Sequence, residues 1–427
     1  MKNTNMLIDV SETPSKAKLI VLAFQHVFAM FGGTILVPIL VNGALGTEVI
    51  SIPVALFASG LGTIIYILFT KGMSPIYLGS SFAFITPMII GASIGGINGV
   101  YTGIIVAGLV YIVFSIIIKI IGKGWIKKLF PPIVVGPIMI IIGLSLAPVT
   151  MHQIGLVGNE TLSWQPIVIA SAAFLATAIT GIYAKGFWKA ILFLVGILTG
   201  FTISVALGMI NFNALTDASW LTIPKFILPF KDYSLSIGAL IVIVPVALVT
   251  IAEHIGTHIT MSKIIDKDLL EDPGLDNTLL GDGIATAVAG MIGGPANTSY
   301  SENVAVVGLT KVASIFVICL TALIVITMAF LGKLTAIIAL IPDSVFGGVS
   351  IILYGFISVN GLKLLIQNKV DLDKTKNIIV VASMLVFGLS GSAVSILLGN
   401  FSLALSGMSL AAIIGILLNL LFVEKNS

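Results

Sequence analysis

Charged residues are scarce in this chain, and arginine is absent from it altogether. Of 427 residues only 9% are charged, against 58% hydrophobic residues, and the mean hydropathy is +1.17. A soluble domain carries about a quarter charged residues, because its surface faces water. Twenty-one basic and 18 acidic residues are too few for a soluble surface on this chain. The composition therefore predicts a polytopic membrane protein.

The missing residue types exclude several kinds of site. All 21 basic residues are Lys, so no guanidinium can hold a phosphate or carboxylate in the bidentate manner of Arg. The net charge of +3 is spread along the chain and forms no nucleic-acid-binding patch. The single cysteine, Cys319, lies in an apolar run, which excludes an intrachain disulfide and disfavours a thiol metal site. The polar N-terminus lacks the hydrophobic region of a signal peptide and is expected to be cytosolic.

Apolar runs of the length of a membrane helix, about 20 residues, recur throughout the sequence. Twelve runs are clear candidates, at roughly 18–42, 50–70, 100–121, 132–150, 165–184, 189–209, 235–262, 277–293, 311–331, 344–362, 377–393 and 404–423. Two further runs, 75–92 and 294–309, contain Gly, Ser, Pro or Asn at their centres, which a helix facing lipid would avoid. Each of these two is therefore expected to be a broken span or a re-entrant loop.

The positions of the lysines decide whether the two interrupted runs cross the membrane, because cytoplasmic loops are enriched in Lys. If both runs cross, 18 lysines lie on the cytoplasmic side and only Lys225, Lys231 and Lys333 lie outside. If neither run crosses, the division becomes 12 inside and 9 outside. The sequence therefore predicts an all-α polytopic protein with 14 transmembrane segments and both termini in the cytoplasm.

An internal repeat supports this topology. Three positions of the first half recur at offsets of 210, 211 and 211 residues: Gly122, Pro131 and Gly136 correspond to Gly332, Pro342 and Gly347. The interrupted runs also correspond, since Ser81 lies 220 residues before Ser301. Seven spans per half would invert the second copy, and inverted repeats with matched interrupted helices are typical of transporters. We expect two inverted seven-span repeats, with spans 3 and 10 broken by short extended pieces.

The interrupted runs are also candidates for ligand binding. Backbone that leaves a helix at membrane depth must be buried in protein or line a polar cavity. A half-helix that begins at the midplane presents free N–H groups and a partial positive charge. The two runs are therefore expected to meet near the centre and to offer backbone donors to a small ligand. For either run alone, close helix packing at glycine is the alternative.

Two acidic residues are predicted to lie inside the membrane, and the others are assigned to loops or span ends. Glu253 lies midway along the eighth predicted span, and Glu302 lies in the second interrupted run. An ionised carboxylate at the bilayer centre is costly, so such residues mark functional sites. A carboxylate that takes up a proton there would suit a proton carrier. The alternative is a structural carboxylic acid bonded to helix backbone.

Two histidines follow the first of these glutamates. His254 and His258 are four residues apart and share a helix face, while Glu253 lies about 100° away from His254. Such a pair beside a glutamate could bind zinc, but the spacing differs from His-Glu-x-x-His and no third ligand is evident. We expect no metal site and no cofactor, and an intramembrane metalloenzyme stays a distant alternative. His26 is expected to be a packed, hydrogen-bonded histidine.

Five motifs, in order along essentially the whole chain, resemble the nucleobase–cation symporter family (the nucleobase–ascorbate transporters), and within it the bacterial uracil permeases. The motifs lie at 25–32, 77–84, 252–256, 297–303 and 347–355. The resemblance implies proton-coupled uracil uptake across the cytoplasmic membrane by alternating access, with the proton as coupling ion, and no enzymatic activity. It also implies a core domain, 1–125 with 233–335, and a gate domain, 126–232 with 336–427.

The resemblance further implies which residues bind the substrate. In the family, the carboxylate matching Glu253 hydrogen-bonds the pyrimidine, and the one matching Glu302 holds the opposite edge and is tied to proton coupling. Backbone amides matching Phe82 and Ser301 reach the carbonyl oxygens, and four side-chain positions wall the ring. The expected substrate-binding residues are Glu253, Glu302, Phe82, Ser301, Tyr300, Tyr354, Gly33 and Ser81.

The sequence departs from the family pattern at two places. The histidine that often follows four residues after the first glutamate is Thr257 here, and His258 comes one step later. A direct Glu–His proton pair is thereby put in doubt, although Thr257 and His258 stay in the expected proton-coupling set with Glu253 and Glu302. The usual Asn-x-Gly after the second glutamate reads Asn303-Val304-Ala305.

Several alternatives stay open at this point. The substrate could be xanthine, guanine or another nucleobase, and the coupling ion could be Na⁺, although purine-specific relatives tend to carry Gln at the position of Glu302. An anion transporter of the same inverted architecture would need a positive site without carboxylates, and a channel is disfavoured by a closed midplane site. The expected partners are a nucleobase and the lipid bilayer, not nucleic acid, and the apolar gate domain would support a homodimer.

Overall fold

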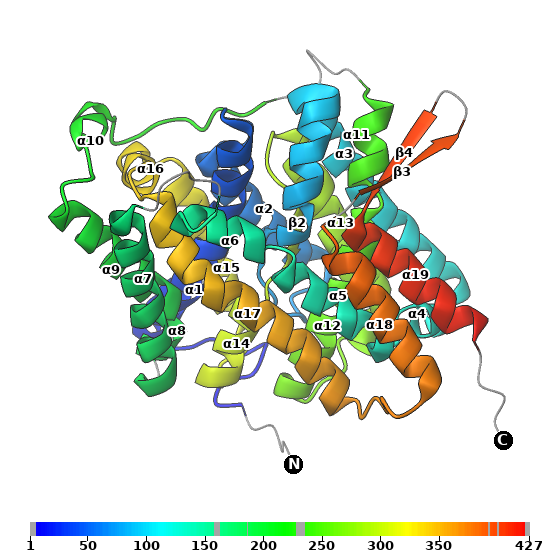
Figure 1. Cartoon of the computed structure of the whole chain (residues 1–427). Helices are drawn as coiled ribbons and strands as arrows, with labels where there is room; N and C mark the ends of the chain where they lie inside the picture. Colours follow the sequence, from blue (N-terminus) through cyan, green and yellow to red (C-terminus); the bar gives the residue numbers. More distant parts are fainter. Residues whose placement is uncertain are drawn as a thin grey trace.

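Helices follow the apolar runs of the sequence through most of the chain (Figure 1). The structure is a computed structural model that describes residues 6–157, 163–185, 187–227, 235–391, 393–398 and 401–422. Its first half contains α1 (Lys16–Leu45), α2 (Ile52–Phe69), β1 (Leu78–Ser80), η1 (Phe82–Phe84), α3 (Ile85–Ile121), α4 (Gly124–Leu129), α5 (Pro132–Leu144), α6 (Ala147–Ile154), α7 (Trp164–Tyr183), α8 (Phe187–Ala190), α9 (Leu192–Ala206) and α10 (Asn213–Asp217).

The second half repeats the same kinds of element. It contains α11 (Ile237–Ile243), α12 (Val246–Ile265), η2 (Leu270–Gly274), α13 (Leu275–Met291), β2 (Asn297–Ser299), α14 (Ser301–Thr310), α15 (Ile315–Ala329), α16 (Gly332–Ala339), α17 (Asp343–Gln367), α18 (Thr375–Leu389), β3 (Ala393–Leu398), β4 (Phe401–Ser406) and α19 (Gly407–Leu421).

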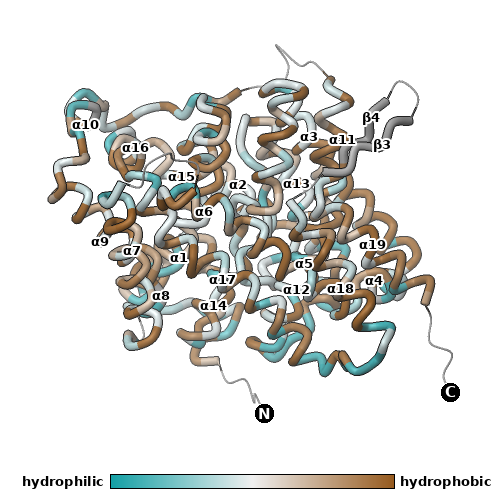
Figure 2. The backbone as a smooth tube through the Cα atoms, in the orientation of Figure 1, coloured by the Kyte–Doolittle hydropathy of each residue, from teal (hydrophilic) through white to brown (hydrophobic). Residues whose placement is uncertain are grey.

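Many of these helices are suited to a lipid environment. Within the described residues, seven helices are long and apolar enough to cross a membrane, by length and composition. Shorter apolar helices are α9, α15, α18 and α19. Hydrophobic residues cover most of the helical segments, and hydrophilic ones gather in loops at the two ends (Figure 2). The chain is a multi-pass membrane protein, while the count of fourteen crossings and the inversion of the halves stay predictions.

The two interrupted runs contain the extended pieces that the sequence predicts. β1 and β2 pair antiparallel, with Leu78 opposite Ser299 and Ser80 opposite Asn297, and all six strand residues are buried. The Ser81 amide donates to the Ala296 carbonyl at 2.8 Å, which extends the ladder by one step. This pairing satisfies backbone groups that have no helical partner, as membrane depth requires. Each strand then leads into a helix, β1 into η1 and α3, and β2 into α14.

Helix α3 covers the second part of the predicted run 75–92, from Ile85, and the whole of the predicted span 100–121. The backbone of Gly96, with φ 65° and ψ −171°, is not helical and separates the two parts. This φ lies in the left-handed region that glycine adopts without steric cost. The break falls where the sequence places the connection between the third and fourth spans.

The helices pack in two groups, and the paired strands contact α1, α2 and α13 of the first group together with α12. In one group, α13 packs on α2 and α3, α15 on α1 and α2, and α11 on α3. In the other, α17 packs on α5, α6 and α7, while α7 packs on α9 and α18 packs on α5 and α19. Helix α12 contacts members of both groups. The sequence assigns the first group to the core domain and the second to the gate domain, and the boundaries at 125, 232 and 335 stay a prediction.

A pair of strands lies between the helices of the last two predicted spans. β3 and β4 pair antiparallel from Ala393 opposite Ser406 to Leu398 opposite Phe401. The spans predicted at 377–393 and 404–423 therefore correspond to the shorter helices α18 and α19. Short apolar runs do not separate strand from helix by periodicity alone. The Gly399-Asn400 dipeptide in the sequence is a turn signal that could have identified the hairpin.

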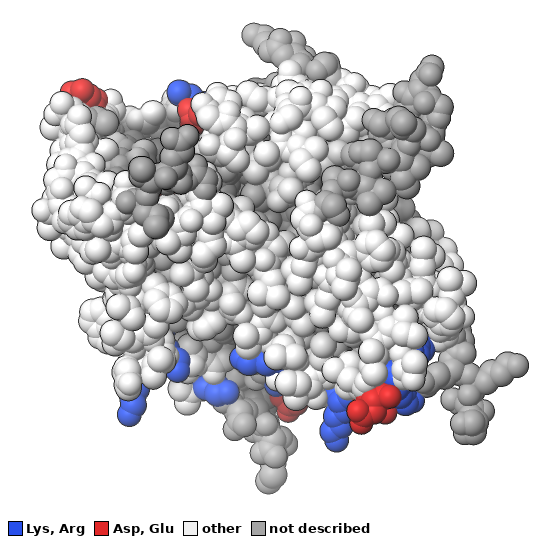
Figure 3. Space-filling view, in the orientation of Figure 1, with Lys and Arg blue, Asp and Glu red and all other residues white. Residues whose placement is uncertain are grey.

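Lysines gather at one end of the molecule on the face drawn in Figure 3, and few charged residues lie between the two ends. This distribution agrees with a bilayer crossing the middle of the molecule. The orientation itself stays a prediction, because it depends on the sidedness of the loops. Lys231 and both chain termini lie outside the described residues.

Candidate functional site

The first predicted carboxylate is buried against the second strand. Glu253 lies in the middle of α12, and only 7% of the residue is exposed. The Thr298 hydroxyl, from β2, donates to Glu253 Oε2 at 3.3 Å. Among the described residues, no ion pair between Glu253 and a lysine occurs. The unwound segment therefore supplies the polar neighbour of this carboxylate.

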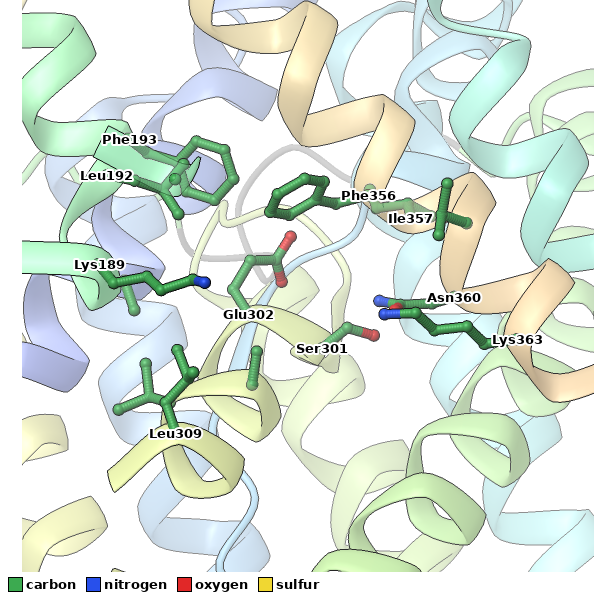
Figure 4. Close-up of a pocket in the computed structure, with 15 residues that line it drawn as sticks. Lys189, Leu192, Phe193, Ser301, Glu302, Leu309, Phe356, Ile357, Asn360 and Lys363 are labelled. Carbon is green, nitrogen blue, oxygen red and sulfur yellow. The ribbon is translucent and has the colours of Figure 1, made fainter. Parts of the chain in front are cut away.

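The second carboxylate faces a cavity. Glu302 lies in the first turn of α14 and, with Ser301, lines a cavity of about 270 Å³. Lys189 of α8 and Lys363 of α17 approach this cavity from opposite sides, and Phe193 of α9 closes part of its wall (Figure 4). Glu302 is the only acidic residue among the lining residues. The cavity thus lies between α1 and α14 and four helices that the sequence assigns to the gate, α7, α8, α9 and α17.

The start of α14 has no side-chain cap. The helix begins at Ser301, directly after the last strand residue and Tyr300. The first N–H groups of a helix have no partner within the helix, and they favour an electronegative ligand. Because Ser301 lines the cavity, the amides of this first turn are placed to serve a carbonyl oxygen. The corresponding helix start in the first half is at Phe82, after β1.

An aromatic pair links the first interrupted run to α17. The rings of Phe82 and Tyr354 meet edge to face, with centroids 5.6 Å apart and an interplanar angle of 77°. Both residues are buried. Within the described part of the chain, the Tyr354 hydroxyl has no hydrogen-bond partner, and the same holds for the hydroxyls of Ser350 and Ser81. Buried polar atoms are normally paired, so these orphaned hydroxyls indicate a place for a polar ligand or water.

Tyr300 is locked between α1 and β1. Its hydroxyl donates to the Ser80 carbonyl at 2.9 Å and accepts from the Thr34 hydroxyl at 3.3 Å. A Cβ added to Gly79 would lie 2.3 Å from the Tyr300 ring, and one added to Gly33 would lie 3.2 Å from it. Gly33 therefore shapes the site by making room for this ring. The fixed ring in turn sets the position of Ser301 at the start of α14.

Substitution of Gly79 by Ala is expected to destabilise the protein, because the added methyl group must push the Tyr300 ring out of its place. Overpacking of a buried site costs about 1–3 kcal/mol. We expect a lower melting temperature in detergent and reduced transport for Gly79→Ala. Gly355→Ala on α17 is the matched control, since its Cβ would meet nothing within 4 Å. Equal melting of the two variants would contradict the packing role of Gly79.

The expected proton-coupling residues beyond the glutamates lie apart from each other. Thr257 is buried, its hydroxyl has no partner among the described residues, and it lines a second cavity of about 520 Å³ together with Ser301. His258 is buried elsewhere: its Nδ1 contacts the His254 carbonyl at 2.7 Å and its Nε2 contacts the Tyr66 hydroxyl at 2.6 Å. Both nitrogens of His258 are thus engaged, which leaves no lone pair for the zinc ion that the histidine spacing allowed.

His26 is packed and hydrogen-bonded, as the sequence predicts. The Asn303 amide nitrogen lies 3.0 Å from His26 Nδ1 and 3.2 Å from the His26 carbonyl. Both residues are buried. The contact ties α1 to α14 one residue after Glu302. Asn303 is the first residue of the Asn303-Val304-Ala305 segment that departs from the family pattern. Its contact with His26 holds α14, the helix that carries Glu302, in place.

The prediction that the acidic residues other than Glu253 and Glu302 lie in loops or at span ends is wrong for Asp282. Asp282 is fully buried in the middle of α13, and its Oδ2 lies 2.7 Å from His254 Nδ1. From the sequence, only Glu253 and Glu302 are singled out as buried acidic residues. The place of Asp282 as the sixth residue of the run 277–293 was a signal that it could be buried. The contact with His254 could not be read from the spacing, because it joins two different helices.

The comparisons with known proteins cover almost the whole chain. The chain matches the family model described as Permease family, named for xanthine and uracil permeases, over residues 17–397. A protein named uracil permease from Bacillus subtilis is 41% identical over 427 residues, covering 99% of this chain and 96% of the relative. A protein of the same name from Escherichia coli is 38% identical over 421 residues, covering 98% and 94%.

Solved structures with the same fold belong to more distant proteins. The transmembrane domain of the cyanobacterial bicarbonate transporter BicA has a TM-score of 0.65 at 15% identity, covering 96% of this chain and 99% of that domain. The murine anion transporter Solute Carrier 26 family member A9 has a TM-score of 0.64 at 11% identity, covering 96% and 69%. At these identities the likeness concerns the fold alone.

Proposed function

The chain belongs to the permease family that contains the uracil permeases, and on this premise we propose that it imports uracil together with a proton by alternating access. It is a transporter and not an enzyme. The observation that carries the proposal is the pair of carboxylates at the two interrupted segments, Glu253 against β2 and Glu302 at the start of α14. Relatives named uracil permease support the choice of base.

The chemistry of uracil matches the groups of this site. Uracil is neutral and planar, and its edge carries N–H donors and C=O acceptors. Carboxylates accept from the N–H groups, and backbone amides donate to the carbonyl oxygens. In the proposed complex, Glu253 and Glu302 accept from the ring, while the amides of Phe82 and Ser301 donate to it. A neutral ligand also needs no arginine, in agreement with the composition.

The aromatic and small residues around this edge would enclose the ring. Phe82 and Tyr354 are buried and form an edge-to-face pair, and in the proposed complex they form part of the wall around the pyrimidine. The hydroxyls of Tyr354 and Ser81, which have no partner in the described chain, would then gain one. Gly33 and Tyr300 complete the enclosure, with Gly33 keeping the Tyr300 ring in place.

Two cavities support alternating access. The cavity at Glu302 includes Ala29 of α1, whereas a cavity of about 580 Å³ includes Gly43 of the same helix together with His152 and Asp343. The two positions on α1 are about 21 Å apart at 1.5 Å per residue. We propose that rocking of core against gate closes one cavity while it opens the other. Both termini and the lysine-rich end would face the cytoplasm in this arrangement.

Transport assays in proteoliposomes test the proposed function. We expect uptake of labelled uracil to be driven by a pH gradient, acid outside, and to be independent of a Na⁺ gradient. Unlabelled uracil should compete more strongly than xanthine, guanine or cytosine. Uptake that follows Na⁺ instead, or that xanthine blocks more strongly than uracil, would overturn the proposal. A homodimer through the gate helices stays a prediction, which chemical cross-linking of the reconstituted protein would measure.

The structural relatives named for bicarbonate and anion transport raise a second candidate, which the site does not favour. An anion beside Glu253 would meet a carboxylate that has no lysine partner among the described residues, and one beside Glu302 would meet a carboxylate that already shares its cavity with Lys189 and Lys363. Like charges at this depth repel strongly, since the interior screens them poorly. The shared fold therefore carries a site of different chemistry in this chain.

A further inference from the structure

A second group of titratable side chains lies behind the proposed uracil site. His254 Nδ1 on α12 and Asp282 Oδ2 on α13 are 2.7 Å apart, and neither side chain is exposed. His254 follows Glu253 directly in the chain, about 100° further around the helix. The pair therefore lies next to the carboxylate site but is not part of the surface offered to the substrate.

Strand β2 connects the two sites. The Ser299 hydroxyl lies 3.2 Å from His254 Nδ1 and 3.4 Å from Asp282 Oδ2. The preceding residue, Thr298, donates instead to Glu253. Successive side chains of a strand point to opposite faces, so one face of β2 serves the carboxylate and the other serves the Asp–His pair. A displacement of this strand when the substrate binds would act on both.

The neighbouring histidine is held in its neutral form. His258 Nδ1 lies 2.7 Å from the His254 carbonyl, which can only accept, so this nitrogen carries the hydrogen. Its Nε2 then accepts from the Tyr66 hydroxyl at 2.6 Å, and the Tyr66 oxygen lies 2.7 Å from the Ser74 hydroxyl. The rings of His254 and His258 are stacked with centroids 3.8 Å apart. If both imidazoles were protonated, two positive charges would face each other at this distance and repel. His258 therefore stays neutral when His254 takes up a proton.

The surroundings offer the pair no permanent counter-charge. The titratable groups that face it are Glu253 and His258 on α12, Tyr66 on α2 and Tyr111 on α3. None of these is a lysine, and no ion pair of the described residues other than its own involves Asp282. An ionised Asp282 beside a neutral His254 therefore leaves one uncompensated negative charge in the membrane interior, which is costly.

Two atoms of the pair are open to an added proton. Asp282 Oδ1 and His254 Nε2 are buried and have no hydrogen-bond partner within the described chain. A proton that binds either atom changes the net charge of the pair from −1 to 0 and breaks no existing hydrogen bond. On Oδ1 it produces a neutral carboxylic acid beside a neutral imidazole, and on Nε2 it produces a carboxylate–imidazolium ion pair.

We propose that Asp282 and His254 form a second proton-binding site, which takes up and releases one proton during the transport cycle and is linked to the uracil site by β2. This inference rests on the proposed proton-coupled function. It adds to Glu302, which contacts the substrate in the proposed complex, a second proton-binding group that does not contact the substrate. The competing explanation is a permanently protonated pair that only joins α12 to α13.

Asp282→Asn in the full-length chain tests the proposal, because the amide keeps the size of the side chain and cannot ionise. Two transport modes would be compared in proteoliposomes: exchange of labelled for unlabelled uracil at equal pH, and accumulation driven by a pH gradient. We expect accumulation to fall by about tenfold or more, the factor of one pH unit, while uracil binding measured by calorimetry persists. The protons taken up per uracil bound, from calorimetry in buffers of different ionisation enthalpy, should fall by a measurable fraction.

His254→Gln provides a second variant in case Asp282→Asn does not fold, since a glutamine amide can still donate to Asp282 but cannot take up a proton. It should show the same loss of gradient-driven accumulation. Asp282→Glu should restore part of the accumulation, which a size-dependent structural role would not predict. Asp276→Asn, at the cytoplasmic end of the same helix α13, is the matched control and should behave as the wild type.

The possible results separate this inference from the proposed function. Wild-type protein that does not respond to a pH gradient would overturn the proton-coupled function itself and the second site with it. If wild-type protein and the Asp282→Asn variant accumulated uracil equally in response to a pH gradient, the second proton-binding site alone would be overturned. If Asp282→Asn had the melting temperature of the wild type but lost uracil binding and accumulation to the same extent, the role of the Asp282–His254 pair would be structural.

Discussion

Glu253→Ala is expected to abolish uracil binding. The side chain is buried, and its carboxylate has one identified partner, the Thr298 hydroxyl at 3.3 Å, so its remaining acceptor capacity is available to the N–H groups of the base. A hydrogen bond to a charged group contributes about 1.5–3 kcal/mol, and loss of two such bonds would weaken binding by a factor on the order of 10² or more. Calorimetric titration and uracil-dependent thermal stabilisation would measure the loss.

The controls for this experiment follow from the same geometry. Glu48→Ala removes an exposed glutamate and should leave the affinity unchanged. Thr298→Val removes the hydroxyl that positions Glu253 and should weaken binding less than loss of the carboxylate does. An unchanged affinity in Glu253→Ala would show that this carboxylate does not hold the base, and the site would then have to lie around the cavity at Glu302 alone.

The parts of the site that the sequence predicts are those marked by residues unsuited to lipid. Glycine, serine and asparagine inside apolar runs identified both interrupted segments, because such residues disfavour a lipid-facing helix. The structure accordingly contains β1 and β2 there, followed by helix starts at Phe82 and Ser301. Burial of Glu253 followed from its central position in an apolar run, without any knowledge of its neighbours.

The parts that the sequence did not predict depend on contacts between distant segments. The pairing of His254 with Asp282 joins two helices, and a hydrophobic pattern contains no information on which faces meet. Gly33 was assigned to the wall of the ligand site by resemblance, but only the structure places its hydrogen next to the Tyr300 ring. Likewise, the sequence indicated only that Lys189 and Lys363 lie in loops or at span ends. The structure shows that both lysines line one cavity.

These two lysines bear on how a proton could be released. Ionised Glu302 would share its cavity with the cationic ends of Lys189 and Lys363, which both belong to helices assigned to the gate. In the alternating access proposed above, the gate moves away from α14, and the carboxylate would then lose this favourable environment. A group whose counter-charges come from the opposite domain thus gains and loses its proton with the conformational change, which is what a coupled transporter requires.

Glu302→Gln is accordingly expected to lower the accumulation of uracil driven by a pH gradient by about tenfold per pH unit. A gradient of one pH unit stores about 1.4 kcal/mol per proton, enough for about tenfold accumulation of a neutral substrate for each proton carried with it. Glutamine can still accept a hydrogen bond but cannot carry the proton, so the variant should lose the share of the inside-to-outside ratio that this proton drives. Labelled uracil uptake into proteoliposomes at imposed pH gradients measures this ratio.

The distinction between coupling and binding makes this prediction specific. Glu302→Gln should still bind uracil, more weakly than the wild type because the neutral amide is a poorer acceptor than a carboxylate, and the binding should respond less to pH. Asp343→Asn, at the other cavity, is the matched control and should keep the wild-type accumulation ratio. If Glu302→Gln retained full accumulation with its pH dependence, Glu302 could not be the carrier of the coupling proton, and either Glu253 or the Asp282–His254 pair would have to carry it.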